Sequence, residues 1–460
     1  MLFNSYIYIF AFLPVTLIGY FFLNQKKSSN IAKWWLLCMS LVFYGHYKKG
    51  HIPIIIGSII FNYLIGFFLT KTHRGPHIKK ILLFTGIMGN VALLSYFKYF
   101  DFVIENINYC FKTHFSLMSL LLPLGISFFT FTQIIYLVDA YKGKITNHDF
   151  VNYGLFITFF PHLLAGPILH HKQMIDQFND ENNKQINYQN IAIGLLLFTL
   201  GLAKKLLIAD TFATYANTGF AAPSSLSFLE SWTTSLSYTL QLYFDFSGYS
   251  DMALGSSLMF NVALPINFNS PYKATTIQDF WRRWHITLSN FLRDYIYIPL
   301  GGSRVNELAT CRNLIITFLV GGFWHGAGWT FFFWGLLHGI GLVIQRVWQK
   351  TSIIIPNLLA WFITFNFVNI GWVFFRAPDF DTALTMLTGM IGFHGFFPSS
   401  SLITIILIII FLAVCFLAKN SQQLTENFKP TVGSSIVVAL LLTCSVLCLR
   451  SYSEFLYFRF

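Results

Sequence analysis

Long apolar runs recur along the whole chain and are separated by short polar segments. A membrane-crossing helix needs about 20 mainly apolar residues, and runs such as 314–343 and 402–418 approach or exceed that length. The first run starts at Leu2 with no basic stretch and no small-residue cleavage site, which indicates a first span and not a removable signal. The pattern predicts about a dozen spans, at residues 4–24, 31–46, 52–70, 81–98, 117–138, 190–208, 230–246, 310–324, 327–347, 357–375, 402–418 and 433–449.

Two segments depart from this pattern. Residues 150–168 are apolar but broken by Pro161, Gly166 and Pro167, which favours a re-entrant helix buried in protein. Residues 267–312 are polar, aromatic and charged, and are long enough for one or two interfacial helices packed on the bundle. Because the sequence holds no internal repeat, low-complexity tract or linker, we expect residues 1–460 to form a single integral membrane domain.

Composition and charge agree with a membrane protein. The chain is 55% hydrophobic and 10% charged, with a mean hydropathy of +0.59, whereas soluble domains carry about 25% charged residues. Its net charge of +12 fits the positive-inside rule and contact with lipid headgroups, and no polar domain offers a basic face to a nucleic acid. Basic residues after the first and third runs indicate cytoplasmic loops and an outside N-terminus, against a weaker contrary signal at 48–49; they are Lys26, Lys27, Lys33, Lys71, Arg74, Lys79 and Lys80.

Several kinds of chemistry lack their sequence signature. The six cysteines show no CxxC and no Cys/His ligand spacing, so neither a metal site nor a redox motif is indicated. The chain has no P-loop, no GxGxxG and no G-x-S-x-G elbow, which argues against nucleotide hydrolysis, dinucleotide chemistry and a serine hydrolase.

His325 is the sharpest candidate for a catalytic residue. It lies within an apolar segment and is ringed by Gly321, Gly322, Gly326 and Gly328. Ionisable groups at membrane depth usually face a cavity or pathway, and histidine is the usual general base. The glycines then leave space beside the imidazole for a substrate. The alternative is a structural histidine hydrogen-bonded across helices, with the glycines serving close helix packing.

A second candidate cluster surrounds His285. On a helix, Trp281 and His285 share a face, and Asp279 can pair with Arg283. Arginine together with aromatic rings suits a ligand that carries phosphates and a base, such as a CoA-type donor. The alternative is an interfacial helix whose Trp and Arg side chains anchor at the headgroups.

Acidic residues near the end of a predicted span form a third cluster. Asp245 and Asp251 lie in the stretch 241–251, where they either line a polar tunnel and orient a base or sit at a plain capped helix end.

Taken in order, these motifs resemble the membrane-bound O-acyltransferase superfamily, and within it the alginate and peptidoglycan O-acetyltransferase branch. The similarity covers most of the chain and rests on Asp245–Asp251, Phe280–His285, Arg293–Tyr295, Pro299–Arg304 and Gly322–Gly326, with further matches at Phe160–Ile168, Gly371–Ala377 and Phe455–Phe460. One departure stands out. That branch usually has an arginine soon after the Gly-Pro-Ile turn, where this chain has Leu169, His170 and His171.

The resemblance implies an all-α, polytopic helical bundle around a central tunnel, in a bacterial inner membrane. It implies His325 as the catalytic residue and His285 as a second family histidine. It also implies an acyl donor on the cytoplasmic side, with no bound cofactor and acetyl-CoA as the expected donor. The acceptor is then a hydroxyl of an exported polysaccharide or cell-envelope glycan, reached through a periplasmic SGNH-type acetyltransferase partner.

The expected donor site is cytoplasmic and lies within residues 267–304. We expect the phosphates of the donor to be held by Arg282, Arg283 or nearby basic residues such as Arg304. Trp281 and Asp245 are expected as further binding residues. His325 would remove a proton from the acceptor hydroxyl, which then attacks the thioester carbonyl.

Two other functions remain open at this point. The first is D-alanyl transfer from a carrier protein to teichoic acid, which needs a cytoplasmic docking surface in place of a nucleotide pocket. The second is a transporter without chemistry, although the sequence lacks the repeated broken-helix halves common in transporters.

The C-terminal tail offers one more candidate. Tyr457 lies in an aromatic frame at 455–458 after the last apolar run. Its hydroxyl is suited to carrying the acyl group as a covalent intermediate, and the alternative is an aromatic anchor at the membrane interface.

Overall fold

The computed structural model describes residues 1–26, 29–71, 75–145, 148–396, 402–426, 428–449 and 455–456. All regular secondary structure in these ranges is helical. By length and composition, six helical segments can cross a membrane, namely Tyr8–Gln25, Lys49–Lys71, Pro76–Phe111, Tyr188–Ala221, Trp329–Trp348 and Asn357–Arg376. Shorter apolar helices lie at Ile126–Tyr141, Leu402–Leu417 and Val432–Leu447. The protein is therefore a polytopic membrane helical bundle.

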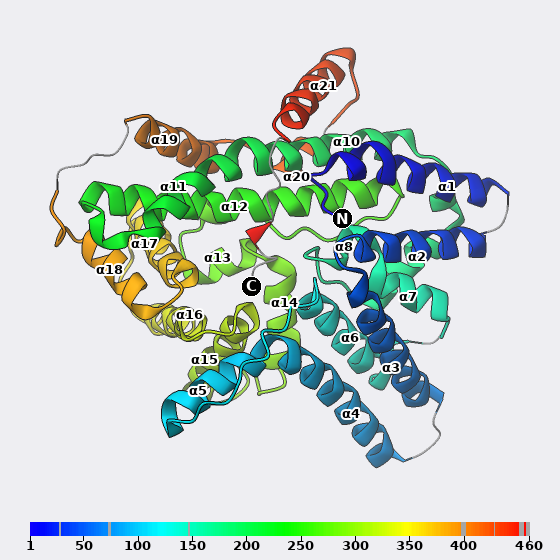
Figure 1. The fold of residues 1–460 in the computed structure, drawn as a ribbon, viewed down its shortest axis with the longest axis horizontal. Helices are drawn as coiled ribbons and strands as arrows, with labels where there is room; N and C mark the ends of the chain where they lie inside the picture. Colours follow the sequence, from blue (N-terminus) through cyan, green and yellow to red (C-terminus); the bar gives the residue numbers. More distant parts are fainter. Residues whose placement is uncertain are drawn as a thin grey trace. The chain divides into compact units, whose positions relative to one another are not determined.

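The chain divides into two compact units. Figure 1 shows the helices of both, coloured along the sequence. Unit 1 comprises residues 1–202, 249–265 and 428–454. Its helices are α1 (Leu13–Gln25), α2 (Ser29–Gly45), α3 (Ile52–Lys71), α4 (Pro76–Leu94), α5 (Phe100–Phe111), α6 (Ile126–Tyr141), α7 (Phe150–Thr158), α8 (Phe160–Leu163), α9 (His171–Asn179), α10 (Tyr188–Ala203), the end of α12 (Phe228–Met259) and α21 (Val432–Leu447).

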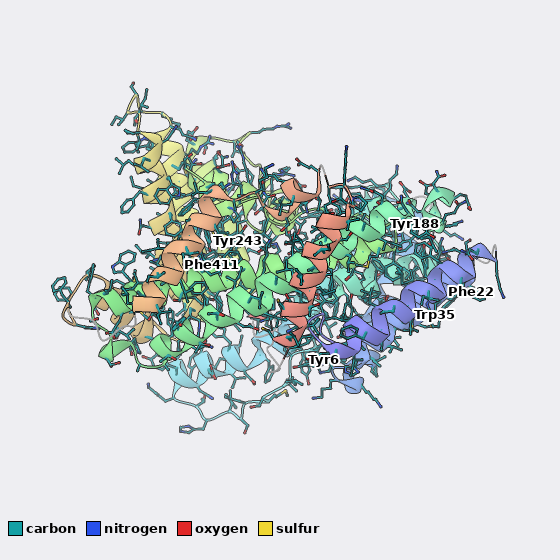
Figure 2. The ribbon with its side chains drawn as sticks, turned by 90° about the horizontal axis from the view of Figure 1, so that it is seen from above. Tyr6, Phe22, Trp35, Tyr188, Tyr243 and Phe411 are labelled. Carbon is teal, nitrogen blue, oxygen red and sulfur yellow. The ribbon has the colours of Figure 1, made fainter. Side chains whose placement is uncertain are left out.

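Small and polar residues hold the helices of unit 1 together. Trp35 of α2 packs over Gly19 of α1 and donates a hydrogen bond to the Thr16 carbonyl at 3.0 Å (Figure 2). Asn62 of α3, Asn90 of α4 and Gln133 of α6 are buried, and Asn62 is hydrogen-bonded to both of the others. Close approach at glycine and hydrogen bonds between helices are the usual ways to associate helices where lipid gives no hydrophobic drive.

One predicted segment of unit 1 is interrupted in the structure as expected, and another begins at the wrong residue. The broken stretch at 150–168 forms two short buried helices, α7 and α8, separated at Phe159. The predicted span at 117–138 begins too early, because the helix starts only at Ile126. Pro123 precedes that start, and Gly125 at its N-terminal cap adopts a φ of 71°, a left-handed conformation that glycine adopts without strain.

Unit 2 comprises residues 203–248, 266–427 and 455–460, of which the structure describes the ranges given above. It contains a π-helical turn η5 (Lys204–Ala209), α11 (Asp210–Ala221), most of α12, α13 (Ile277–Arg283), α14 (Ile286–Leu292), a second π-helical turn η8 (Arg293–Tyr297), α15 (Glu307–His325), α16 (Trp329–Trp348), α17 (Asn357–Arg376), α18 (Phe380–Met390), α19 (Leu402–Leu417) and α20 (Ser421–Thr425). The polar region at 267–312, predicted to form one or two helices, supplies the two short helices α13 and α14.

Helices α15 and α16 form the most extensive helix pair of unit 2 and lie side by side as an antiparallel hairpin (Figure 1). A Cβ added at Gly322 of α15 would lie 2.4 Å from the Phe331 carbonyl oxygen, and one at Gly335 of α16 would lie 2.3 Å from that of Phe318. Backbones this close leave no room for a side chain, so both positions require glycine.

Candidate active site

The two histidines singled out by sequence lie together in unit 2. The ring centroids of His285 and His325 are 6.5 Å apart, with an interplanar angle of 62°. Their exposed fractions are 0% and 3%, so both imidazoles sit inside the protein. The junction of α13 and α14 and the end of α15 therefore bring two titratable side chains into one buried site.

His285 is held in place by an unusual backbone conformation. It lies between α13 and α14 with a φ of 43°, in the left-handed region that non-glycine residues rarely adopt. Asn267 fixes this turn from a neighbouring segment: its carbonyl accepts the Ile286 N–H at 3.0 Å, and its side-chain oxygen accepts the Thr287 hydroxyl at 2.8 Å. Strained conformations that persist because their surroundings enforce them cluster at functional sites.

His325 ends α15 inside an aromatic enclosure. Its ring centroid lies 5.1 Å from those of Trp334 and Phe375 and 4.9 Å from that of Trp324. The neighbouring glycines do not leave open space beside the imidazole, which corrects the first interpretation of this motif. Gly322 packs against α16, and a Cβ at Gly326 would lie 2.2 Å from the Phe331 ring. Gly322 and Gly326 thus serve packing, and the packing positions the histidine.

The two histidines are suited to different roles. Burial lowers the pKa of His285 from 6.5 to about 3, so its ring is neutral at physiological pH. A general base works best when its pKa lies near the working pH. His285 therefore fits an orienting group better than a proton acceptor.

A pocket of about 390 Å³ opens in the same unit, lined by residues of α13 to α16 and η8. Arg282, Arg293 and Arg346 lie on its wall together with Gln278, Gln345 and Gln349, and Trp281 and Phe318 supply apolar surface. Such a combination of guanidinium groups, amides and one indole suits a ligand with phosphates and an aromatic base.

The pocket and His325 lie at different levels of the α15–α16 hairpin. The pocket is lined by Phe318 of α15 and by Arg346 and Gln349 near the end of α16. His325 is seven residues beyond Phe318, which is about 10 Å along a helix. A ligand in the pocket would need an extended arm to bring a reactive group to the histidines.

Trp281 connects the pocket to the histidine cluster. It lines the pocket and donates its Nε1–H to Nδ1 of His338 at 3.2 Å. Its ring centroid lies 5.7 Å from that of Trp334, which in turn packs on His325. His338, fully buried on α16, was missed by sequence reasoning. The available signal was an ionisable residue inside an apolar run, four residues after Trp334.

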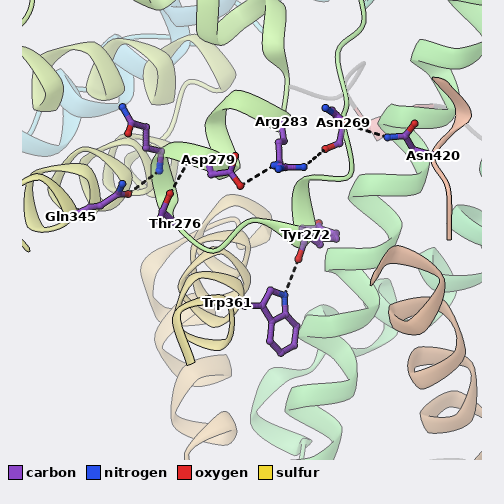
Figure 3. A network of polar contacts seen from close by, with 9 residues as sticks. Asn269, Tyr272, Thr276, Asp279, Arg283, Gln345, Trp361 and Asn420 are labelled. Carbon is purple, nitrogen blue, oxygen red and sulfur yellow. Dashed lines mark hydrogen bonds and ion pairs between the residues drawn. The ribbon is translucent and has the colours of Figure 1, made fainter. Parts of the chain in front are cut away.

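Only one of the two adjacent arginines faces the pocket. Arg282 lines it and has no ion-pair partner within the described ranges. Arg283 instead bonds Asp279 Oδ2 at 2.9 Å and the Asn269 carbonyl at 3.4 Å (Figure 3). The other pocket arginines are paired, Arg293 with Asp294 and Arg346 with Glu307.

Arg304 and Asp245 are not among the residues that line the pocket. Arg304 is exposed in the turn before α15. Asp245 is buried on α12, and its carboxylate pairs with Lys205 at 2.6 Å. Lys205 was not singled out from the sequence, although a lysine within an apolar run was the available signal. Tyr457 lies outside the described residues.

Comparison with known proteins shows the enzyme family to which this chain belongs. Residues 137–377, which include both histidines, match the membrane-bound O-acyltransferase family. A peptidoglycan O-acetyltransferase of Helicobacter pylori is 45% identical over 100% of this chain and 98% of its own. A probable alginate O-acetylase of Pseudomonas aeruginosa is 40% identical over 85% of this chain and 75% of its own. A teichoic acid D-alanyltransferase of Bacillus subtilis is 25% identical over 80% of this chain and 95% of its own. The chain therefore belongs to the membrane-bound O-acyltransferase family and is a multi-pass membrane O-acetyltransferase.

Proposed function

We propose that this enzyme takes acetyl from acetyl-CoA on the cytoplasmic side of a bacterial inner membrane and moves it toward hydroxyls of an exported glycan. A periplasmic SGNH-type acetyltransferase is the proposed partner that completes delivery. The observation that carries the proposal is the buried His285–His325 pair beside an arginine-lined pocket, with His325 about 10 Å along α15 from the pocket residue Phe318.

The donor is proposed to bind in the pocket of α13 to α16. Arg282 has no ion-pair partner among the described residues and can meet a phosphate, and Trp281 offers an indole for stacking. The flexible arm of acetyl-CoA would then run past Trp281 toward His325. This path accounts for the separation of about 10 Å along α15 between the pocket wall and the histidine.

The chemistry balances as a simple acyl transfer. His325 takes the proton of the attacking hydroxyl, whose oxygen forms a bond to the acetyl carbonyl carbon. The carbon–sulfur bond of the thioester then breaks, and the proton passes to the leaving thiolate. Neutral His285 orients the reacting groups from the α13–α14 turn. Whether the first acceptor is a free hydroxyl or that of Tyr457 is decided by Tyr457→Phe, which keeps the ring and removes the nucleophile.

Peptidoglycan is the preferred acceptor in this proposal. The relative named a peptidoglycan O-acetyltransferase matches the full chain at 45% identity, compared with 40% over 85% of the chain for an alginate O-acetylase. Alginate is the second candidate.

The test is ester-linked acetate on purified glycans from cells carrying the wild type or His325→Ala. We expect acetate on peptidoglycan to require His325, at equal amounts of protein in the membrane. Loss of D-alanyl ester from teichoic acid, with acetate unchanged, would replace acetyl by D-alanyl as the transferred group. Unchanged esters on every glycan would reject the proposed function.

A further inference from the structure

A buried ion cluster in unit 2 shares no residue with the pocket lining or with the histidine pair. Lys205 of η5 pairs with Asp245 of α12 at 2.6 Å and with Asp210 at 2.9 Å. The side chains of Lys205 and Asp245 are both 2% exposed. Burying two charges is costly, and well-packed apolar side chains often give equal or greater stability. Stability alone therefore does not explain an ion pair buried at this depth.

This pair contacts Phe455 and Leu456, which form the described part of the C-terminal segment. Asp245 Oδ2 accepts the backbone N–H of Leu456 at 2.9 Å, while its other oxygen faces Lys205. The Lys205 ammonium lies 4.9 Å from the ring centroid of Phe455, at cation–π distance. Phe455 and Leu456 are 1% and 7% exposed. Main chain and aromatic ring of the segment are thus both recognised by one ion pair.

We propose that Lys205 and Asp245 form a docking site for the C-terminal segment, and that acyl transfer requires the segment docked. The two residues are positioning residues, because they act through the segment and not on the acetyl group. The inference rests on the proposed function. Docking fixes the backbone at Leu456, next in sequence to Tyr457, the hydroxyl-bearing residue of the aromatic frame.

A pair of double variants separates docking from charge. Lys205→Met with Asp245→Leu removes both charges and also the oxygen that accepts the Leu456 N–H. Lys205→Met with Asp245→Asn removes the same charges, keeps the same side-chain shape and retains an acceptor oxygen. Neither variant leaves an uncompensated charge at the fully buried positions, and the Asp210 carboxylate, which loses Lys205 in both, is 25% exposed and can be hydrated, so both variants are expected to fold. The two differ mainly in the bond to the segment.

Docking itself is read by thiol labelling. Leu456→Cys keeps the backbone N–H and is introduced after the six native cysteines are replaced. A permeable maleimide should react slowly in the parent and only slightly faster in the Lys205→Met, Asp245→Asn variant, which loses the contact of Lys205 with the Phe455 ring but keeps an acceptor for the Leu456 N–H. In the Lys205→Met, Asp245→Leu variant the labelling rate should rise about tenfold, which is the change expected from losing one charge-assisted hydrogen bond. Asn369→Leu, which breaks a buried network with Ser235 and Thr239 in the same unit, controls for general loosening.

The same variants, with native Leu456, are then assayed for acetyl transfer. We expect the variant with Asp245→Leu (the Leu variant) to lose about tenfold in kcat with an unchanged KM for acetyl-CoA. The variant with Asp245→Asn should retain most of its activity. Equal labelling of the two variants, equal losses of activity in both, or full activity in an undocked Leu variant would each overturn the inference. A wild type that transfers no acetyl would reject the proposed function, while the labelling contrast would still report on docking.

Discussion

Trp281 donates its indole N–H to Nδ1 of His338 and forms part of the pocket wall, so one side chain borders both the arginine-lined pocket and the buried aromatic cluster around His325. The hydrogen bond fixes the rotation of the indole ring. In the proposed function, the arm of the donor has to pass this ring. The position of Trp281 thus links binding in the pocket to chemistry at His325.

Truncating the ring should affect transfer more than binding. For Trp281→Phe, which loses the N–H but keeps an aromatic wall, we expect kcat to fall by about tenfold, as when one positioning hydrogen bond is lost. Steady-state kinetics with acetyl-CoA at matched protein would measure it. A normal kcat in Trp281→Phe would show that the hydrogen bond to His338 has no role in transfer.

The two adjacent arginines give a matched pair of variants. Arg282 lines the pocket, whereas Arg283 is held by Asp279 and the Asn269 carbonyl (Figure 3). Arg282→Gln should raise the KM for acetyl-CoA by about 10–100-fold, since a hydrogen bond to a charged group contributes about 1.5–3 kcal/mol. Arg283→Gln should leave KM within about threefold. A larger effect from Arg283→Gln would place the donor phosphates elsewhere.

His285 should make stability depend on pH. Its pKa falls from 6.5 to about 3 on folding, because burial disfavours the charged ring. The neutral ring's contribution is therefore fully present above pH 6.5 and is progressively lost as the pH falls from 6.5 toward 3. Unfolding midpoints in detergent at pH 7.5 and 5.0 should differ more for the wild type than for His285→Gln, which does not titrate. Equal pH dependence in both proteins would contradict the assignment.

Glycine packing in the α15–α16 hairpin sets a stability prediction. Gly322→Ala places a methyl 2.4 Å from a backbone oxygen, and overpacking of this kind typically costs about 1–3 kcal/mol. Gly328→Ala is the matched control, because its Cβ would make an ordinary 3.5 Å contact with Phe331. Thermal unfolding of the two purified variants measures the difference. Similar midpoints would show that the helices can separate without cost.

Much of the fold can be predicted from the sequence, because the length of an apolar run and the residues that interrupt it directly determine where a helix can form. The α13–α14 pair and the broken segment at α7 and α8 were predicted, since Pro161 and the Arg-rich stretch mark them locally. The start of α6 was misplaced because residues before Pro123 are apolar yet irregular.

The site was only partly predictable, for a different reason. His325 and His285 stand out as ionisable groups among apolar neighbours. In contrast, the pocket joins residues of α13 with Gln345 and Arg346 near the end of α16, and Asp245 meets Lys205 forty residues away. Tertiary packing alone creates these pairings, and no local spacing signals them. The role of the glycines around His325 was likewise decided by the neighbouring helix and not by their spacing.

Acetyl transfer by purified protein in proteoliposomes tests the central claim most directly. The measurement is the initial rate of acetyl-CoA-dependent acetyl transfer to an acceptor glycan for the wild type and His325→Ala, at equal amounts of folded protein and with the proposed periplasmic partner present in excess. Losing a positioned general base should lower kcat by about 10²–10⁴-fold while leaving KM for acetyl-CoA nearly unchanged, because the pocket lies seven residues away along α15. A His325→Ala enzyme with a near-normal kcat would contradict the account.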